Sequence, residues 1–307
     1  MPYRLRHVHA YLLAQDKNLA LFDTGLNTDG ALAALEKDLQ SVGLDIRNIT
    51  QAYLTHVHTD HCSMAGLLQK MTGAKIHLSA PAFLEYRHYR KADEAVAMAR
   101  SFYARHGMTP AEIDAIIDEF EDIRGIITEF SADDILREGQ VCKFGSTQFE
   151  VIFTPGHASG HICFFFAKEK FLLSGDHVLP YIAPSLAPNI FDESDRPLKT
   201  YLASLGKIGK LRCAEIHPGH GNSFSGVDER IAEIRAHHDQ RKSFFYEFLN
   251  NAPKTARAIA QEIFGEDLPD FEKFMALNET FVYLQELKAE GRVAEKMEGN
   301  AFVDAAS

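Results

Sequence analysis

Three histidines and one aspartate fall within six residues of this chain, in the stretch His56-Val57-His58-Thr59-Asp60-His61. The stretch comes directly after the apolar run Ala52-Tyr53-Leu54, which is typical of a buried strand. Crowded imidazoles and a carboxylate without a partner would destabilise a fold that contained no compensating ion. Imidazole and carboxylate groups together suit zinc, iron or manganese. The stretch therefore predicts a metal site at the end of a strand.

Three further candidate ligands lie far along the chain, and each follows an apolar strand through a turn that contains glycine. They are His157 in Thr154-Pro155-Gly156-His157, Asp176 in Ser174-Gly175-Asp176, and His220 in His217-Pro218-Gly219-His220-Gly221. Because catalytic groups are commonly carried on loops of a rigid scaffold, we expect all of them at the same edge of a sheet. Together, the four segments predict a site for divalent metal ions.

The other histidines and the cysteines carry weaker signals. His161, His177 and His217 are close to candidate ligands in sequence, and we expect them to be structural or to support the ligands. Seven histidines have no partner motif and are expected at the surface or in the core: His7, His9, His77, His88, His106, His237 and His238. The four cysteines form no CxxC pair, which argues against a disulfide framework or a thiolate zinc site, and Cys62 is expected to be a small buried residue.

Short strands and covering helices must position these groups. Apolar runs bounded by turn residues predict strands at 9–13, 19–22, 52–54, 75–78, 148–153, 162–166, 171–173 and 213–216. Helical spacing predicts helices at 31–42, 65–71 and 200–207. Residues 82–130 are polar and rich in Ala, Glu and Arg, which predicts a helical insertion with a helix start at Thr109-Pro110.

The chain changes character again near its end. Residues 255–264 and 274–290 have the spacing of amphipathic helices, and residues 292–303 have the pattern of a small hairpin. Two helices and a two-stranded wing favour a winged-helix-like domain. We therefore expect a catalytic domain over residues 1–250, which includes the insertion, and a small C-terminal domain over residues 251–307.

The motifs resemble the metallo-β-lactamase superfamily, whose His-x-His-x-Asp-His hallmark is complete at residues 56–61. The resemblance covers about residues 5–225 and implies an α/β fold, an αββα sandwich of two mixed sheets packed face to face with helices outside. It also implies seven metal ligands in two sets. One set is His56, His58 and His157, the other is Asp60, His61 and His220, and Asp176 bridges the two ions. Asp23 resembles an aspartate of the superfamily that supports the site from outside the ligand set.

The ligands define the chemistry. Two divalent ions about 3.5–4 Å apart hold and acidify a bridging water, which gives hydroxide near neutral pH. Asp60 could also orient this nucleophile, and Tyr181 is a candidate hydrogen-bond donor to a developing oxyanion. We expect zinc, with manganese or iron as alternatives. The complete second set counts against a mononuclear iron oxygenase of the persulfide type.

Charge narrows the choice of substrate. The net charge of −11 argues against broad binding of phosphate backbones. Residues 253–307 hold six Lys or Arg against eleven Asp or Glu, so we expect the tail to serve in packing, dimerisation or walling the site rather than in reading RNA. Residues 82–106 hold five Lys or Arg against three Asp or Glu, and this basic segment is either a solvated helix face or a cap that meets an anionic group.

We therefore expect a di-metal hydrolase that acts on an ester, thioester or lactone of a small anionic molecule. The tail also resembles that of lactamase-beta-like endoribonucleases, so the alternative is a metal-dependent endoribonuclease or another phosphodiesterase. A regulator that binds DNA through the winged helix is a further alternative. The first residues lack the apolar core of a signal peptide, and no stretch approaches about 18 apolar residues. We expect a cytoplasmic protein without a membrane partner, and we leave open whether it forms a homodimer.

Overall fold

The computed structural model describes residues 7–249 and 253–306 and contains two five-stranded sheets. The first sheet consists of β1 (Tyr11–Gln15), β2 (Asn18–Phe22), β3 (Ile49–Tyr53), β4 (Lys75–Ser79) and β5 (Asp134–Leu136), in that order. The second consists of β10 (Glu215–Pro218), β9 (Phe171–Gly175), β8 (Ile162–Phe166), β7 (Thr147–Phe153) and β6 (Val141–Phe144). Both are mixed sheets, because each contains parallel and antiparallel pairs.

The topology brings several strand ends to one edge. β2 and β3 run parallel in the first sheet, so their carboxyl ends point the same way. In the second sheet, β7 and β9 are both antiparallel to β8 and β10 is parallel to β9. The carboxyl ends of β7, β9 and β10 therefore also share one edge. Each candidate ligand follows one of these strand ends in the sequence.

Aromatic side chains from both sheets fill the space between them. The Phe22 ring of β2 lies 5.1 Å from the Phe149 ring of β7 and 5.0 Å from the Phe164 ring of β8, both in edge-to-face geometry. Tyr53 of β3 also meets Phe149 edge to face at 5.1 Å. Fully burying a large apolar side chain contributes about 1.5–3 kcal/mol, so this layer fixes the two sheets face to face.

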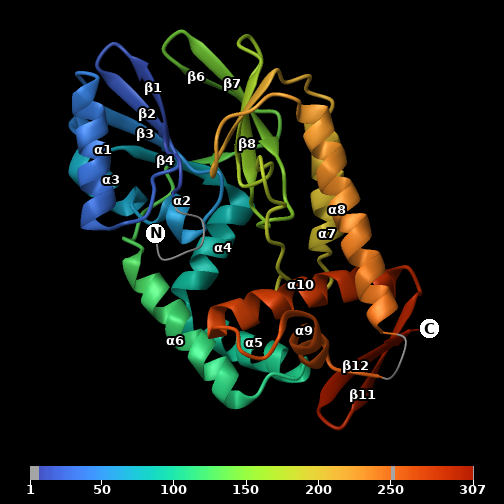
Figure 1. Ribbon diagram of the computed structural model, residues 1–307. Helices are drawn as coiled ribbons and strands as arrows, with labels where there is room; N and C mark the ends of the chain where they lie inside the picture. Colours follow the sequence, from blue (N-terminus) through green and yellow to red (C-terminus); the bar gives the residue numbers. More distant parts are fainter. Residues whose placement is uncertain (1–6, 250–252, 307) are drawn as a thin grey trace.

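Helices cover both outer faces of the sandwich (Figure 1). The helices beside the first sheet are α1 (Asp29–Ser41) and α3 (Ala65–Thr72), and the short α2 (Thr59–Cys62) follows the end of β3. Thr28 caps α1 by accepting a hydrogen bond from the Ala31 amide, and Leu39 of α1 is buried in a cluster with residues of β2, β3 and α3. The helices beside the second sheet are α7 (Pro197–Ile208) and α8 (Val227–Phe248).

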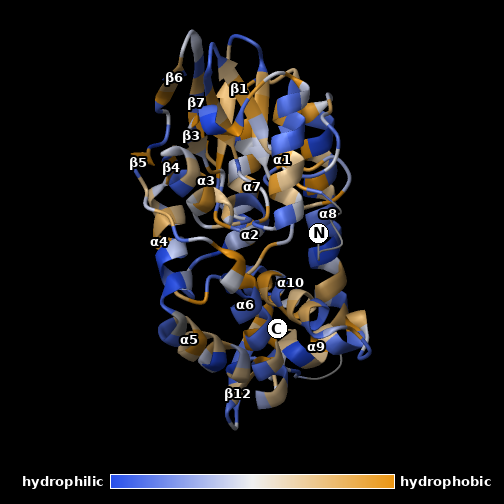
Figure 2. Cartoon of the chain, turned by 90° about the vertical axis from the view of Figure 1, so that its left-hand side faces the viewer, coloured by the Kyte–Doolittle hydropathy of each residue, from blue (hydrophilic) through white to orange (hydrophobic). Residues whose placement is uncertain are grey.

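A helical layer lies at the end of the sandwich opposite the β6–β7 hairpin (Figures 1 and 2). It combines α4 (Ala80–Arg90), α5 (Ala92–Arg105) and α6 (Pro110–Ile126) with α9 (Ala256–Phe264), α10 (Asp270–Ala289) and the hairpin of β11 (Val293–Glu298) and β12 (Ala301–Ala306). One buried cluster joins Phe102 of α5, Ile116 of α6 and Leu277 of α10 to Tyr201 of α7 and Leu172 of the second sheet. The insertion and the C-terminal elements thus share a core with the outer face of the second sheet.

The αββα sandwich of mixed sheets is confirmed, and the strands and helices expected from the sequence are present with small shifts of their ends. The helix start expected at Thr109-Pro110 is also present, and Thr109 and Glu112 form a capping box there. The sequence analysis missed β5, β6 and α8. β5 has three residues, and the buried stripe of α8 is narrow and interrupted by His238, so their signals are weak.

The C-terminal part consists of two helices and a two-stranded sheet. Its winged-helix character stays a prediction, as does the division into domains at residues 250 and 251, which lie outside the described residues. In the part of the chain that the structure describes, every helix is too short or too polar to cross a membrane.

Candidate metal centre

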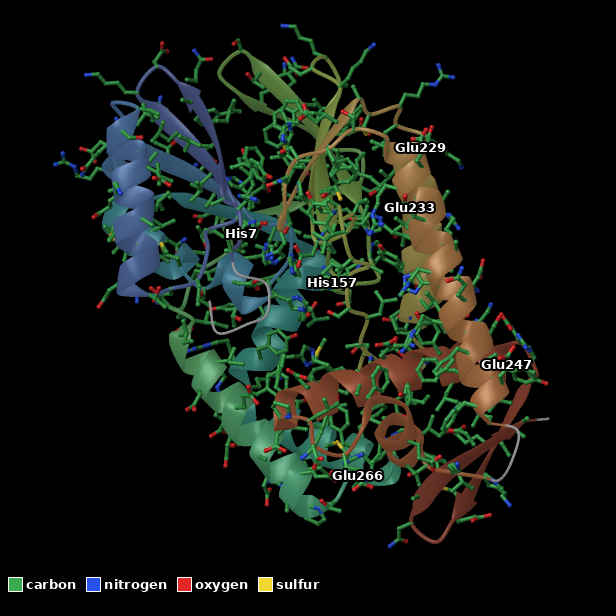
Figure 3. The ribbon with its side chains drawn as sticks, in the orientation of Figure 1. His7, His157, Glu229, Glu233, Glu247 and Glu266 are labelled. Carbon is green, nitrogen blue, oxygen red and sulfur yellow. The ribbon has the colours of Figure 1, made fainter. Side chains whose placement is uncertain are left out.

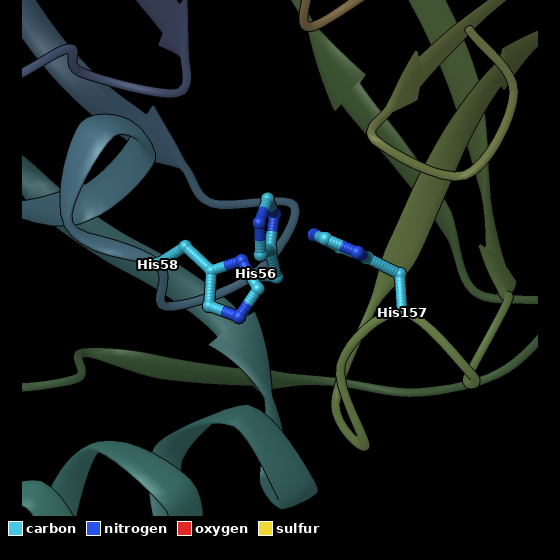
Figure 4. Close-up of side chains that lie close together, drawn as sticks. All are labelled: His56, His58 and His157. Atoms are coloured by element: carbon cyan, nitrogen blue, oxygen red, sulfur yellow. The ribbon is translucent and has the colours of Figure 1, made fainter. Parts of the chain in front are cut away.

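The candidate ligands meet at the edge that the sequence analysis predicted. The chain leaves β3 at Tyr53 and passes His56 and His58 before α2 begins, and Asp60 and His61 belong to α2. His157 follows β7, Asp176 follows β9, and His220 follows β10. Figure 4 shows His157 reaching from the second sheet toward His56 and His58 on the first. The site therefore lies between the two sheets and draws side chains from both.

Three groups of these side chains can hold a metal ion. In each group the potential ligand atoms lie within 4.8 Å of one another. The groups are His56, His58 and His157; His56, His61 and Asp176; and Asp60, His61 and His220. All seven residues predicted from the sequence are thus brought together.

Asp176 lies between the histidines of the two sheets. Its Oδ1 is 3.4 Å from His61 Nε2, and its Oδ2 is 3.6 Å from His157 Nε2 and 3.4 Å from His220 Nε2. The carboxylate of Asp60 approaches the same place, with Oδ2 3.2 Å from His220 Nε2. The two carboxylates therefore lie close to the Nε2 atoms of several histidines, within the reach of a shared metal ion.

Several buried ligand atoms have no hydrogen-bond partner among the described residues. They are Nε2 of His56, His61, His157 and His220, and Oδ1 of Asp176. Buried polar atoms are nearly always paired, and each unpaired one costs about 1–3 kcal/mol. Each of these five atoms belongs to one of the groups that can hold a divalent cation, which would satisfy it, so the residues present fit a metal centre.

The opposite ring nitrogens are held by neighbouring groups. His56 Nδ1 lies 2.9 Å from the Thr55 hydroxyl, and His61 Nδ1 lies 2.9 Å from Asp23 Oδ2. His157 Nδ1 donates to the Ser185 carbonyl at 2.7 Å, and His220 Nδ1 donates to the His7 carbonyl at 2.5 Å. A fixed partner on Nδ1 leaves Nε2 free for a metal ion and sets the orientation of the ring. The supporting role expected of Asp23 matches this arrangement.

Glycine at position 219 leaves room for the Asp176 carboxylate and the His61 ring. A Cβ atom on Gly219 would lie 2.4 Å from Asp176 Oδ1 and 2.7 Å from His61 Cε1. His161, which is fully buried, lies beside Gly175, and its Nε2 accepts a hydrogen bond from the Asp176 amide at 3.2 Å. The supporting role expected of His161 therefore has a physical basis, because this contact positions the Asp176 backbone.

Burial and nearby charges act in opposite directions on the pKa values of the ligands. Burial lowers the pKa of His56 well below its usual value and that of His58 to about 3. Burial opposes ionisation of Asp60, but His61 and His220 outweigh it and lower the pKa of Asp60 to about 2. For His220, burial is outweighed by Asp176 and Asp60, which raise its pKa to about 9. Without metal, a proton on His220 therefore balances carboxylate charge that a cation would otherwise neutralise.

Two sequence expectations concern groups around the metal centre. Tyr181 is 73% exposed, and its ring carbon Cε2 lies 3.6 Å from the position of a Cβ atom on Gly221, beside His220.

Four basic side chains of the insertion, all near its surface, form ion pairs with carboxylates: Arg90 with Glu129, Lys91 with Glu94, Arg100 with Asp114, and Arg105 with Glu193. These cations are therefore less available to a substrate than their number suggests.

The sequence analysis missed the roles of His7, His9 and Ser185. The carbonyl groups of His7 and Ser185 accept hydrogen bonds from ligand histidines, and His9 contacts the glycines on both sides of His220. Backbone carbonyls carry no residue-type signal, so no pattern could have identified these two acceptors. The buried position of Cys62, in contrast, is confirmed.

The sequence family agrees with this geometry. The profile of the metallo-beta-lactamase superfamily matches residues 3–220. The chain is 29% identical to the "Probable metallo-hydrolase YqjP" of Bacillus subtilis over 97% of this chain and 93% of that protein. It is 24% identical to the thioesterase pkgB of Emericella nidulans over 80% of this chain and 55% of that longer protein.

A solved structure resembles the whole fold. A metallo-beta-lactamase family protein of Thermus thermophilus superposes with a TM-score of 0.87 at 27% identity, over 100% of this chain and 96% of that one. The similarity includes the helical layer as well as the sandwich, because it extends over the full chain. The ligand-lined edge, the sandwich and the family match agree, and the chain belongs to the metallo-beta-lactamase superfamily as a metal-dependent hydrolase.

Proposed function

We propose that this protein is a two-metal hydrolase of a small carbonyl substrate, with a thioester as the first choice over an ester or a lactone. The observation that carries the proposal is the convergence of seven ligand side chains, in which five buried atoms have no hydrogen-bond partner within residues 7–249 and 253–306. The thioesterase among the relatives supports the substrate class.

In this proposal the ligands form two sets that share one carboxylate. His56, His58 and His157 hold the first ion, and Asp60, His61 and His220 hold the second. The position of Asp176 supports a bridging role, because its two oxygens face His61 on one side and His157 and His220 on the other. Imidazole and carboxylate ligands favour zinc, and manganese and iron are compatible with the same set.

Two divalent ions in these sets would lower the pKa of a shared water and polarise the carbonyl oxygen of the substrate. The chain's own groups prepare the same reaction. Asp60, which is ionised above a pKa of about 2, can accept a hydrogen bond from the attacking water and hold it in line with the carbonyl carbon. Five of the seven ligands are buried, which limits the access of other water to them: His56, His61, His157, Asp176 and His220.

Tyr181 is the proposed hydrogen-bond donor to the oxyanion. Its exposed ring beside Gly221 places it at the rim of the ligand edge, next to the loop of His220. A phenol there can reach a substrate without being buried itself, and one oxyanion donor typically accounts for about 10²–10³ in kcat. Tyr181→Phe removes the hydroxyl and keeps the ring, so it isolates this contribution.

The anionic group expected in the substrate has weaker support than the carbonyl. The ion pairs of Arg90, Arg100 and Arg105 neutralise much of the insertion's positive charge. A neutral acyl thioester is therefore as compatible with the structure as a charged one.

A hydrolysis panel tests the proposal. Metal-free protein is loaded with zinc or manganese and offered aryl esters, acyl-CoA thioesters, lactones and labelled single-stranded RNA, with Asp60→Asn as the matched variant. We expect cleavage of a carbonyl substrate that disappears on chelation and in the variant. Cleavage of RNA alone, lost in Asp60→Asn, would overturn the proposal in favour of the endoribonuclease alternative.

The remaining expectations concern the C-terminal part and assembly. We propose that α9, α10 and the β11–β12 hairpin form a winged-helix-like unit that packs on the insertion, since Arg257 of α9 pairs with Glu112 of α6. Nucleic acid is not an expected partner of this acidic tail, and a gel-shift measurement at physiological salt tests that. Homodimer formation is tested by sedimentation of the metal-loaded protein.

A further inference from the structure

His220 is the one member of its proposed ligand set that comes from the second sheet. Asp60 and His61 both belong to α2, and Asp23 holds His61 from the end of β2. His220 instead follows β10, the edge strand of the second sheet. The second set is therefore complete only if something fixes the loop after β10 relative to the first sheet.

Residues 7–11, which we name the N-terminal clasp, supply that connection. Tyr11 begins β1 and pairs with Phe22 of β2, so the clasp is joined to the first sheet at its last residue. Figure 3 shows His7 in the same region of the molecule as His157, at the ligand edge. β1 and β10 each lie at one edge of their sheet, and the clasp spans from one to the other.

Five hydrogen bonds join the clasp to residues 218–221. The His9 amide donates to the Gly219 carbonyl at 2.8 Å, and the Gly221 amide donates to His7 Nε2 at 3.2 Å. His220 Nδ1 donates to the His7 carbonyl at 2.5 Å. The other two come from side chains, His9 Nε2 to the Gly221 carbonyl and the Tyr11 hydroxyl to the Pro218 carbonyl, both at 2.8 Å.

The rings of the clasp also pack in series. His7 and His9 meet edge to face at 4.8 Å, and Tyr11 lies 5.8 Å from His9 and 5.7 Å from His217 on β10. Every peptide carbonyl from Pro218 to Gly221 except that of His220 is thus fixed by the clasp, and His220 itself is fixed through its ring nitrogen. The ring can then present only Nε2 to Asp60 and Asp176.

We propose that His9 and Tyr11 are positioning residues for His220, and that the clasp determines whether the second metal ion is retained. The inference rests on the proposed two-metal function. The first set does not depend on the clasp, because the loop of His157 is held from the end of β4, where the Ser79 hydroxyl donates to the Gly160 carbonyl at 2.6 Å. Loosening the clasp therefore weakens one ion selectively, which a general loss of stability would not do.

Metal titration of the full-length, metal-free protein tests this selectivity. The double variant His9→Phe/Tyr11→Phe removes both side-chain donors and keeps an aromatic ring at each position. Calorimetry with Zn²⁺ or Co²⁺ gives the two dissociation constants. We expect the second ion to bind about 10–100-fold more weakly and the first within error of the unchanged protein. His9→Gln in place of His9→Phe keeps an N–H donor and should restore most of the lost affinity for the second ion. Tyr103→Phe is the matched control, because its hydroxyl donates to Asn278 in the remote helical core.

A second measurement needs no metal. Nitrogen NMR of the metal-free protein reports the hydrogen bond from His220 Nδ1 to the His7 carbonyl, which we expect to be retained in the unchanged protein and weakened in the double variant. Equal weakening of both ions, or of neither, with an unchanged His220 signal would overturn the inference while leaving the proposed function intact. Binding of a single ion by the unchanged protein would overturn both.

Discussion

The carboxylate of Asp23 accepts a hydrogen bond from Nδ1 of His61 at 2.9 Å. It also accepts bonds from the Thr55 amide at 2.7 Å and the Thr55 hydroxyl at 2.8 Å. Asp23 adopts a left-handed backbone conformation with φ of 58°, which aspartate tolerates better than most residues. One buried carboxylate at the end of β2 therefore orients a proposed ligand and the backbone that carries His56.

Replacing Asp23 tests whether this residue supports the proposed metal ligand His61. We expect Asp23→Ala to weaken metal binding about 10–100-fold, because His61 loses the partner that fixes its tautomer. The free energy of unfolding should also fall, since the two Thr55 donors are left buried and unpaired at about 1–3 kcal/mol each. Competition with a chromophoric chelator measures the first effect and urea unfolding the second. An unchanged metal affinity would contradict the role given to Asp23.

Asp60 is the residue most directly tied to the proposed chemistry. We expect Asp60→Ala to lower kcat by at least about 100-fold while the protein stays folded, since a proposed ligand and the group that orients water are lost together. Steady-state kinetics with circular dichroism and metal analysis on the same preparation measure this. Retained activity with a full metal complement would remove Asp60 from the mechanism.

The metal motif was predictable because it depends on local patterns, whereas the sandwich was expected from the resemblance to the metallo-β-lactamase superfamily. Apolar runs followed by Gly and a His or Asp identify strand ends, and parallel strands must place those ends at one edge. The shared core of Phe102, Leu277 and Tyr201 was not predictable, because it joins residues far apart in the chain. The sequence therefore suggested a separate C-terminal domain, whereas contacts that only the fold reveals link these helices to the insertion.

Charge in the insertion shows a second limit of sequence reasoning. Counting Lys and Arg predicts a basic cap, but Arg100 pairs with Asp114 on the next helix and Arg105 with Glu193 in a distant loop. Neither partner lies in the segment whose charge was counted. The contacts of His7 and His9 were equally hard to predict, because their hydrogen-bond partners lie more than 200 residues away in sequence.

The pH dependence of stability should differ between metal-free and metal-loaded protein. The pKa of His220 rises from 6.5 to about 9 in the metal-free fold, so the protonated ring stabilises that fold fully below pH 6.5. This stabilisation is lost as the pH rises through 9. Metal binding displaces the proton, so metal affinity rises over the same range. Urea unfolding at pH 6, 7.5 and 9, with and without zinc, measures both trends. A metal-free protein that gains stability toward pH 9 would contradict the assignment.

Gly219 offers a steric test of the metal centre. Because a Cβ atom there would lie 2.4 Å from Asp176 Oδ1, we expect Gly219→Ala to displace that carboxylate and to lower affinity for the bridged ions, with the fold retained. Gly125→Ala is the matched control, since no heavy atom lies within 4 Å of its Cβ position in α6. The control should raise stability by about 0.5–1 kcal/mol and leave metal binding unchanged. Equal metal affinity in the two variants would contradict this prediction, because it would show that Asp176 does not need the space beside Gly219.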